Sequence, residues 1–106
     1  MPKVTQTPMI ETQHMLVLST AHISQKTADA LTANDETDQI VYYPKIAKTQ
    51  DTTEILGWFI PVPPDSITDY PADLQAIMQF AKRLNCTWVM LDRDANAVSH
   101  LPIFDW

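Results

Sequence analysis

Five side chains that can do acid–base or nucleophilic chemistry follow two short apolar runs, and they are Ser19, Thr20, His22, Asp92 and Asp94. A hydroxyl beside an imidazole is the arrangement that nucleophilic hydrolases use, and a carboxylate can orient the imidazole or move a proton. If the two runs are adjacent parallel strands, their carboxyl ends meet at one edge of a sheet. A small hydrolase or ligand-binding pocket lined by these residues is therefore one hypothesis for this chain.

The turn after Ser19 also has a structural explanation. Neighbouring residues rarely assemble a catalytic triad, and the sequence assigns no acid that would orient His22. Serine and threonine side chains commonly cap backbone N–H groups where a strand runs into a helix. We therefore expect capping and hydrogen bonding at this turn, and we assign no catalytic residue.

The segment from Asp92 to Asp94 resembles the nucleophile motif of haloacid-dehalogenase-type phosphatases, in which the first carboxylate attacks phosphorus beside a magnesium ion. That motif belongs near the start of a much longer domain, whereas only 12 residues follow Asp94. Asp92, Asp94 and Asn96 also have the spacing that opens a calcium loop. The glycine and glutamate that such a loop requires are replaced by Ala97 and Ile103. An aspartate-rich turn whose side chains bond their own backbone explains the segment better.

Metal and nucleotide motifs are missing from the sequence. The three histidines are dispersed and Cys86 is the only cysteine, so no pair has the spacing of a zinc site. Gly57 is the only glycine, whereas the phosphate-cradling loops of Walker and Rossmann motifs need several. We therefore expect neither a metal nor a cofactor.

The charge of the chain argues against nucleic-acid binding. It has 13 acids against 7 bases, a formal net charge of −6, and its bases are scattered. Proteins that track a phosphate backbone concentrate Lys and Arg instead. An acidic surface remains compatible with a basic partner protein. It is also compatible with an acidic face that occupies the nucleic-acid site of another protein. We expect no direct contact with nucleic acid.

The sequence also predicts a cytoplasmic protein that does not enter a membrane. No segment approaches the roughly 18 apolar residues needed to span a bilayer. The first residues lack the apolar core of a secretory signal. A lone cysteine fits a reducing compartment.

The first half of the chain predicts two strands around a helix. Residues 15–19 form a nearly continuous apolar run, typical of a strand covered on both faces. Ser24 is a suitable N-cap for the helix that follows. Residues 40–43 are β-branched and aromatic, and Pro44 restricts that strand to an edge, a bulge or an early end. The polar segment 48–54 predicts a hairpin loop.

The second half predicts a strand, a helix and a strand. Residues 55–62 are apolar on both faces, which indicates a central strand. Residues 69–71 are a good helix start, and Asn85 is a natural left-handed stop after an apolar helical stripe. Residues 86–91 predict a strand. The aromatic-rich segment 98–106 predicts a short strand or an extended wrap, packed into the fold.

The fold class predicted from this order is α+β. We expect a four- to five-stranded, mainly antiparallel sheet with two helices on one face, in the order strand, helix, strand, strand, helix, strand. A ferredoxin-like arrangement is one topology compatible with that order. Residues 1–13 are predicted to be a flexible N-terminal arm, and residues 14–106 a single domain.

Four segments carry a resemblance to a known family, and they are residues 16–23, 57–59, 88–94 and 101–106. They resemble a family of small bacterial proteins with a domain of unknown function, and the likeness covers residues 15–106. The resemblance implies the company of plasmids, integrative elements and prophages. It supplies no activity and no catalytic residues.

The leading hypothesis from the sequence is a non-enzymatic intracellular module that binds a protein partner. Its sharper form is a mobile-element accessory protein that inhibits or modulates a host defence or nucleic-acid-processing protein. The alternative is the hydrolase or ligand-binding pocket described above. Self-association through an edge strand is a third hypothesis that the sequence does not rank.

Overall fold

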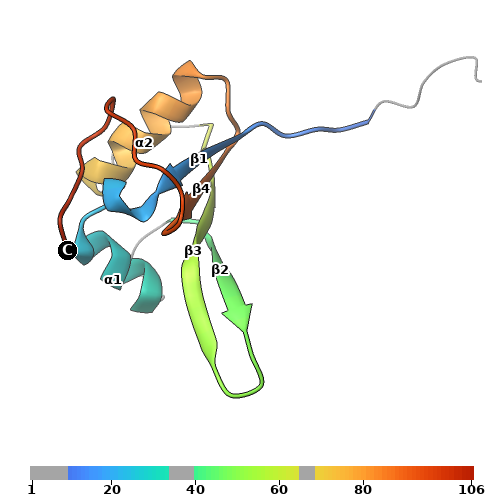
Figure 1. Ribbon diagram of the computed structural model, residues 1–106. Helices are drawn as coiled ribbons and strands as arrows, with labels where there is room; N and C mark the ends of the chain where they lie inside the picture. Colours follow the sequence, from blue (N-terminus) through green and yellow to red (C-terminus); the bar gives the residue numbers. More distant parts are fainter. Residues whose placement is uncertain (1–9, 34–39, 65–68) are drawn as a thin grey trace, which may run out of the picture.

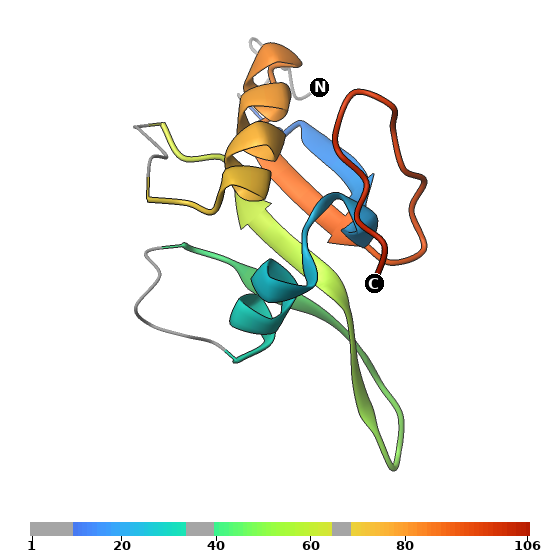
Figure 2. The ribbon, with the colours of Figure 1, turned by 90° about the vertical axis from the view of Figure 1, so that its left-hand side faces the viewer.

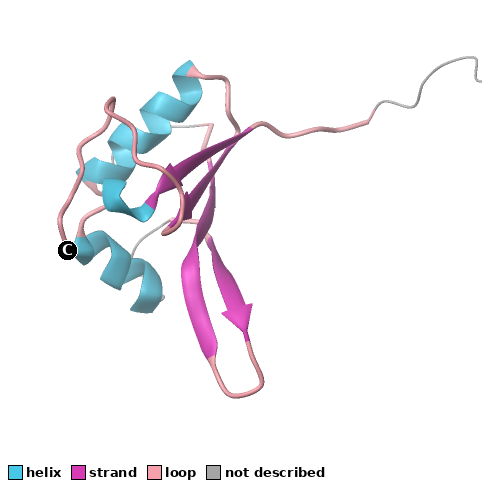
Figure 3. Ribbon diagram, in the orientation of Figure 1, coloured by secondary structure: helices cyan, strands magenta, loops and turns pink. Residues whose placement is uncertain are grey.

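The computed structural model describes residues 10–33, 40–64 and 69–106. They form a four-stranded sheet and two α-helices, which confirms the predicted α+β class and the order of elements. The elements are β1 (Met15–Ser19), the short 3-10 helix η1 (Thr20–His22), α1 (Gln25–Ala33), β2 (Tyr43–Lys48), β3 (Thr53–Pro61), α2 (Ala72–Arg83) and β4 (Trp88–Asp92) (Figure 1 and Figure 3). Of the predicted arm, residues 1–9 lie outside the described residues, and residues 10–14 are exposed and belong to neither helix nor strand.

The strands lie in the order β1-β4-β3-β2. β1 is parallel to β4, whereas β4 pairs with β3 and β3 with β2 in antiparallel fashion, so the sheet is mainly antiparallel as predicted. The order of elements along the chain is that of a ferredoxin-like fold. Within the sheet, however, β1 occupies an edge and β4 separates it from β3.

Both helices and the C-terminal segment lie on the same face of the sheet (Figure 1 and Figure 2). The hydrophobic core fills the space between them. Its buried side chains in the described ranges are Leu18, Ile23, Ala28, Leu31, Ile40, Trp58, Ile60, Leu74, Ile77, Met78, Ala81, Val89, Leu91 and Leu101. Burial of this apolar surface is the main stabilising term of the fold.

The expectation that β1 is covered on both faces is wrong. Leu18 is completely buried against the helices, but Met15 and Val17 are 40% and 46% exposed. Successive side chains of a strand point to opposite faces. Since both helices cover one face, the alternate residues of β1 face away from the core.

The predicted strand 40–43 lies mostly ahead of the observed one, because β2 begins at Tyr43 and runs to Lys48. Pro44 lies inside the strand, opposite Trp58. β2 is an edge strand, where a missing N–H donor is tolerated. The register shifts between Lys45 and Ile46, so both the edge position and the irregularity expected from Pro44 are present.

The end of α2 explains why β4 begins later than predicted. Asn85 adopts a left-handed conformation with φ 58°, as its position after the helix predicted. The N–H of Cys86 then donates to the carbonyl oxygen of Ala81 at 2.9 Å. The N–H of Thr87 donates to the carbonyl oxygen of His14 at 2.9 Å. Cys86 closes the helix, Thr87 bonds the segment just before β1, and β4 itself starts at Trp88.

Asp73 joins the first turns of the two helices. Its Oδ2 accepts from the backbone N–H of Ser24 at 2.8 Å, and its Oδ1 accepts from the hydroxyl of Thr27 at 3.0 Å and from Leu74 N–H at 2.9 Å. Ser24 Oγ accepts from Thr27 N–H at 3.2 Å, as expected for an N-cap. A carboxylate at two helix N-termini is favoured by both helix dipoles.

Gly57 lies where β3 approaches β4 most closely. An added Cβ at this position would stand 1.7 Å from the carbonyl oxygen of Leu91, well inside van der Waals contact. The obstacle is backbone, so a larger residue can be accepted only if the two strands separate. The only glycine in the chain is thus a packing requirement of the central strand pair.

We predict that Gly57→Ala destabilises the fold by at least about 2 kcal/mol, because overpacking against backbone forces the strands apart. Urea unfolding followed by tryptophan fluorescence measures the change. Thr53→Ala, at the exposed start of the same strand, is the matched control and should change the free energy of unfolding by less than about 0.5 kcal/mol. Equal stability of Gly57→Ala and the native chain would contradict the close approach.

Candidate functional site

The structure brings two of the five sequence-predicted site residues to one sheet edge. Ser19 and Asp92 are register partners at the carboxyl ends of β1 and β4, which are parallel neighbours. Register partners on the other two strands extend this pair into a row across the sheet, through Gly57 of β3 to Lys45 of β2. Because Gly57 has no side chain, nothing on β3 separates Lys45 from Asp92, and the two form an ion pair.

The polar groups of this row are used by the fold. Ser19 Oγ accepts from Ala21 N–H at 3.0 Å and caps η1. Asp92 Oδ1 accepts from Asp94 N–H at 2.9 Å, and its Oδ2 bonds Lys45. These contacts match the expectation that both turns bond their own backbone. Asp94 is exposed to solvent.

His22 is buried with a 1% exposed fraction, and both of its ring nitrogens are engaged. Nε2 accepts from Val98 N–H at 2.9 Å, so the proton lies on Nδ1, which donates to the Pro102 carbonyl oxygen at 2.8 Å. A general base needs a nitrogen within reach of substrate. His22 instead ties the C-terminal segment to η1, and neither of its ring nitrogens is free to act as a base in this arrangement.

The C-terminal segment is an extended wrap, which was one of the two forms predicted for it. Phe104 N–H donates to the carbonyl oxygen of Ala21 at 2.7 Å, and Trp106 Nε1–H donates to that of Ile23 at 2.8 Å. Leu101 is buried in the core, whereas the Trp106 side chain is 53% exposed. The end of the chain is therefore anchored by one backbone and one side-chain hydrogen bond to the carbonyl oxygens of Ala21 and Ile23. Thr20 and Arg93 line a separate cavity with Trp106 on the helix side of the sheet.

The ion pair determines the electrostatics of the row. The hydrogen bond from Lys45, and next the one from Asp94 N–H, hold the pKa of Asp92 below its usual value of 3.8. A similar pair joins Arg93 to Glu54, which lowers the pKa of that exposed carboxyl. Asp92 is thus an anion neutralised by Lys45 at neutral pH.

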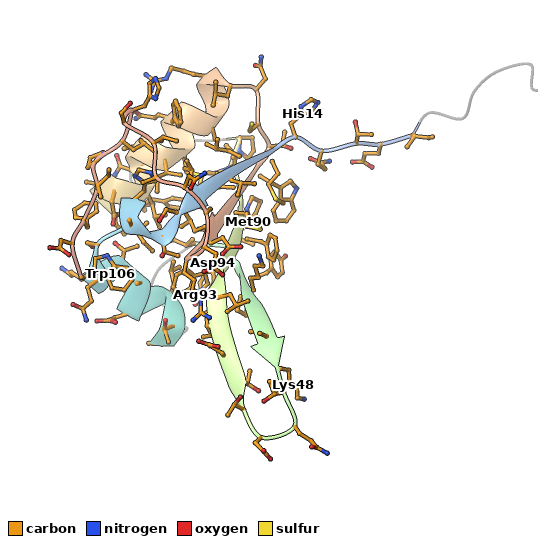
Figure 4. All side chains as sticks on the ribbon, viewed as in Figure 1. His14, Lys48, Met90, Arg93, Asp94 and Trp106 are labelled. Atoms are coloured by element: carbon orange, nitrogen blue, oxygen red, sulfur yellow. The ribbon has the colours of Figure 1, made fainter. Side chains whose placement is uncertain are left out.

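The most distinctive surface of the molecule is one that the sequence did not reveal. Seven apolar side chains on alternate strand positions face away from the helices, and we call this set the open face: Met15, Val17, Tyr43, Phe59, Pro61, Trp88 and Met90. Three of them are large and exposed, with fractions of 40% for Met15, 46% for Val17 and 53% for Tyr43. Figure 4 shows Met90 on this side of the sheet and Trp106 on the helix side.

An aromatic groove occupies one end of the open face. Gln13, Met15, Tyr43, Phe59 and Trp88 line it, and its volume is about 530 Å³. The rings of Tyr43 and Trp88 are 6.1 Å apart between centroids and tilted by 41°. The signal is present in the alternation of residues 15–19 and 55–62. The apolar run 15–19 predicts cover on both faces, and the run 55–62 predicts the central position that β3 has, but neither pattern shows which face lacks a covering layer.

The described part of the chain offers no metal site and no membrane span. No group of three or more His, Cys, Asp or Glu side chains gathers there in a way that could hold an ion. None of the described helices has the length and apolar character needed to cross a bilayer.

Comparison with known proteins places the chain in one family. Residues 15–106 match the model of the C-terminal domain of a family of unknown function, DUF5983, and the chain therefore belongs to that family. The match begins at the first residue of β1 and covers the entire sheet, both helices and the C-terminal wrap. Searches of curated proteins and of solved structures give no match.

We predict that His22→Ala destabilises the fold by about 2–4 kcal/mol, because it removes two buried hydrogen bonds and leaves a cavity. Hydrogen exchange should show the largest loss of protection in residues 98–106. The control is His14→Ala, which changes an exposed side chain and should leave both measurements unchanged. An unaltered C-terminal segment in His22→Ala would contradict the anchoring role.

The Lys45–Asp92 pair also predicts how the free energy of unfolding depends on pH. Because the pKa of Asp92 is lowered by folding, its ionised form stabilises the native state above 3.8, and this contribution is lost as pH falls through the folded-state pKa. Asp92→Asn should therefore be less stable than the native chain at pH 7, and the difference should shrink on acidification below 3.8. Chemical unfolding at several pH values measures this difference in the free energy of unfolding. A difference that stays constant with pH would contradict the ion pair, and exposed Asp94→Asn is the control.

Proposed function

We propose that this domain is a non-enzymatic protein-binding module that holds its partner through the open face. The observation that carries the proposal is an apolar side of the sheet on which none of the described helices packs. An antiparallel sheet with one solvated face normally alternates apolar residues inside with polar residues outside. Here the outward residues include Met15, Val17 and Tyr43, each at least 40% exposed.

The composition of the open face fits a protein interface better than a solvated surface. Exposed apolar area costs roughly 25 cal/mol per Å² relative to burial, so a contiguous patch favours association. Tyr, Trp and Met are enriched in the centres of interfaces. Tyr43, Trp88 and Met90 supply all three residue types within two adjacent rows of the sheet.

Among the described residues, the candidate catalytic groups His22, Ser19 and Asp92 are engaged within the fold, which supports binding over catalysis. His22 uses both ring nitrogens within the fold, Ser19 caps η1, and Asp92 is neutralised by Lys45. Each of these groups would have to break a native contact before it could act on a substrate.

We further propose that the partner is a host protein and that the domain inhibits or modulates it, as an accessory protein of a mobile element. Two features support this sharper form. The resemblance stated above implies the company of plasmids and prophages, and the net charge of −6 suits a basic partner such as a nucleic-acid-processing or defence protein.

The test is a tagged pull-down from a bacterial lysate with nuclease treatment, followed by binding measurements with the purified partner. Tyr43→Ala should weaken the complex by about 2 kcal/mol, roughly thirtyfold, if Tyr43 is an interface anchor. The control is Ile103→Ala, since Ile103 is 61% exposed and lies on the C-terminal segment. A nuclease-resistant complex that Tyr43→Ala leaves at full strength would refute the open face as the binding surface.

A further inference from the structure

We infer that the aromatic groove of the open face receives a basic side chain, arginine or lysine, from the partner protein. The inference rests on the proposed function and specifies the chemistry that the groove recognises. Three aromatic rings, a thioether and an amide line the groove, and no basic side chain lies among them. A cation is attracted to the faces of such rings because their π-systems carry negative charge there.

The rings are arranged so that a cation can contact more than one of them. Tyr43 and Phe59 are register partners on β2 and β3, and Trp88 lies on the next strand with its ring 6.1 Å from that of Tyr43. Cation–π contacts reach about 6 Å from a ring centroid, and tryptophan is the strongest partner. The planes of the two rings are tilted by 41°, and both residues line the groove.

A carboxylate completes the recognition chemistry. Glu11 accepts a hydrogen bond from Gln13 Nε2 at 3.3 Å, and Gln13 is itself a lining residue of the groove. Glu11 is exposed and stands two residues before Gln13 on the extended segment that leads into β1. Glu11 does not line the groove itself, but its carboxylate lies within hydrogen-bond distance of the lining residue Gln13.

The charge balance of the rest of the face favours the same occupant. Asp92 and Lys45 neutralise each other in the adjacent row, so they neither attract nor repel a cation strongly. The whole chain carries −6 and steers basic partners toward it. A purely apolar side chain would gain from the rings but not from the Glu11 carboxylate or from the net charge.

Binding of short peptides to the full chain tests the inference, with two-dimensional NMR at low salt as the readout. The first peptide carries one arginine between glycines and alanines, the second has citrulline in its place, and the third has norleucine. Citrulline keeps the shape of arginine and removes the charge. The arginine peptide should bind about two- to thirtyfold more tightly than the citrulline peptide, with shifts centred on Tyr43 and Trp88.

Two variants make the test specific. Glu11→Gln should lose part of the preference for arginine, and Asp51→Asn, an exposed acid in the loop between β2 and β3, should keep it. Equal affinity for arginine and citrulline, tighter binding of norleucine, or no binding of any peptide would overturn the inference. Tight binding of norleucine would leave the open face as an apolar protein-binding surface, whereas a partner complex insensitive to Tyr43→Ala would refute the proposed function itself.

Discussion

The molecule depends on a one-sided arrangement of its layers. Two short helices and the C-terminal segment all pack on one face of a four-stranded sheet, and one hydrophobic core forms there. The described helices, of 9 and 12 residues, both lie on that face, so no described helix packs on the second one (Figure 1 and Figure 2). The open face is the apolar surface that this arrangement leaves exposed among the described residues.

Buried polar contacts hold the covering layer in place. Asp73 joins the first turns of α1 and α2, and His22 connects η1 to the C-terminal segment through both of its ring nitrogens. Polar groups that are buried and fully bonded rigidify a fold, whereas the same groups left unpaired would destabilise it. His22, a catalytic candidate in the sequence, is therefore also a contact that positions the covering layer.

Much of the fold was predictable because local patterns agree with the tertiary structure. The apolar stripe of α2, the left-handed Asn85 and the N-cap Ser24 each act within a few residues, where sequence spacing is decisive. The predicted strand 40–43 ends before most of β2 because a proline commonly ends a strand. An edge strand tolerates Pro44, so β2 continues through it to Lys48. β4 starts later than predicted because the N–H of Cys86 still bonds back to α2.

The sequence by itself determined the class of fold, the order of its elements and the capping chemistry of its turns. It also identified the two strand ends that meet if their strands are parallel neighbours, and Ser19 and Asp92 are indeed register partners on the parallel pair β1 and β4. Only the tertiary structure decided which side of the sheet is covered, since a strand that is apolar on both faces has the same alternation whether one or two layers pack on it. The aromatic groove, the Lys45–Asp92 pair across Gly57 and the anchoring role of His22 all join residues distant in the chain. Their proximity arises from strand order and helix placement, which no local spacing encodes.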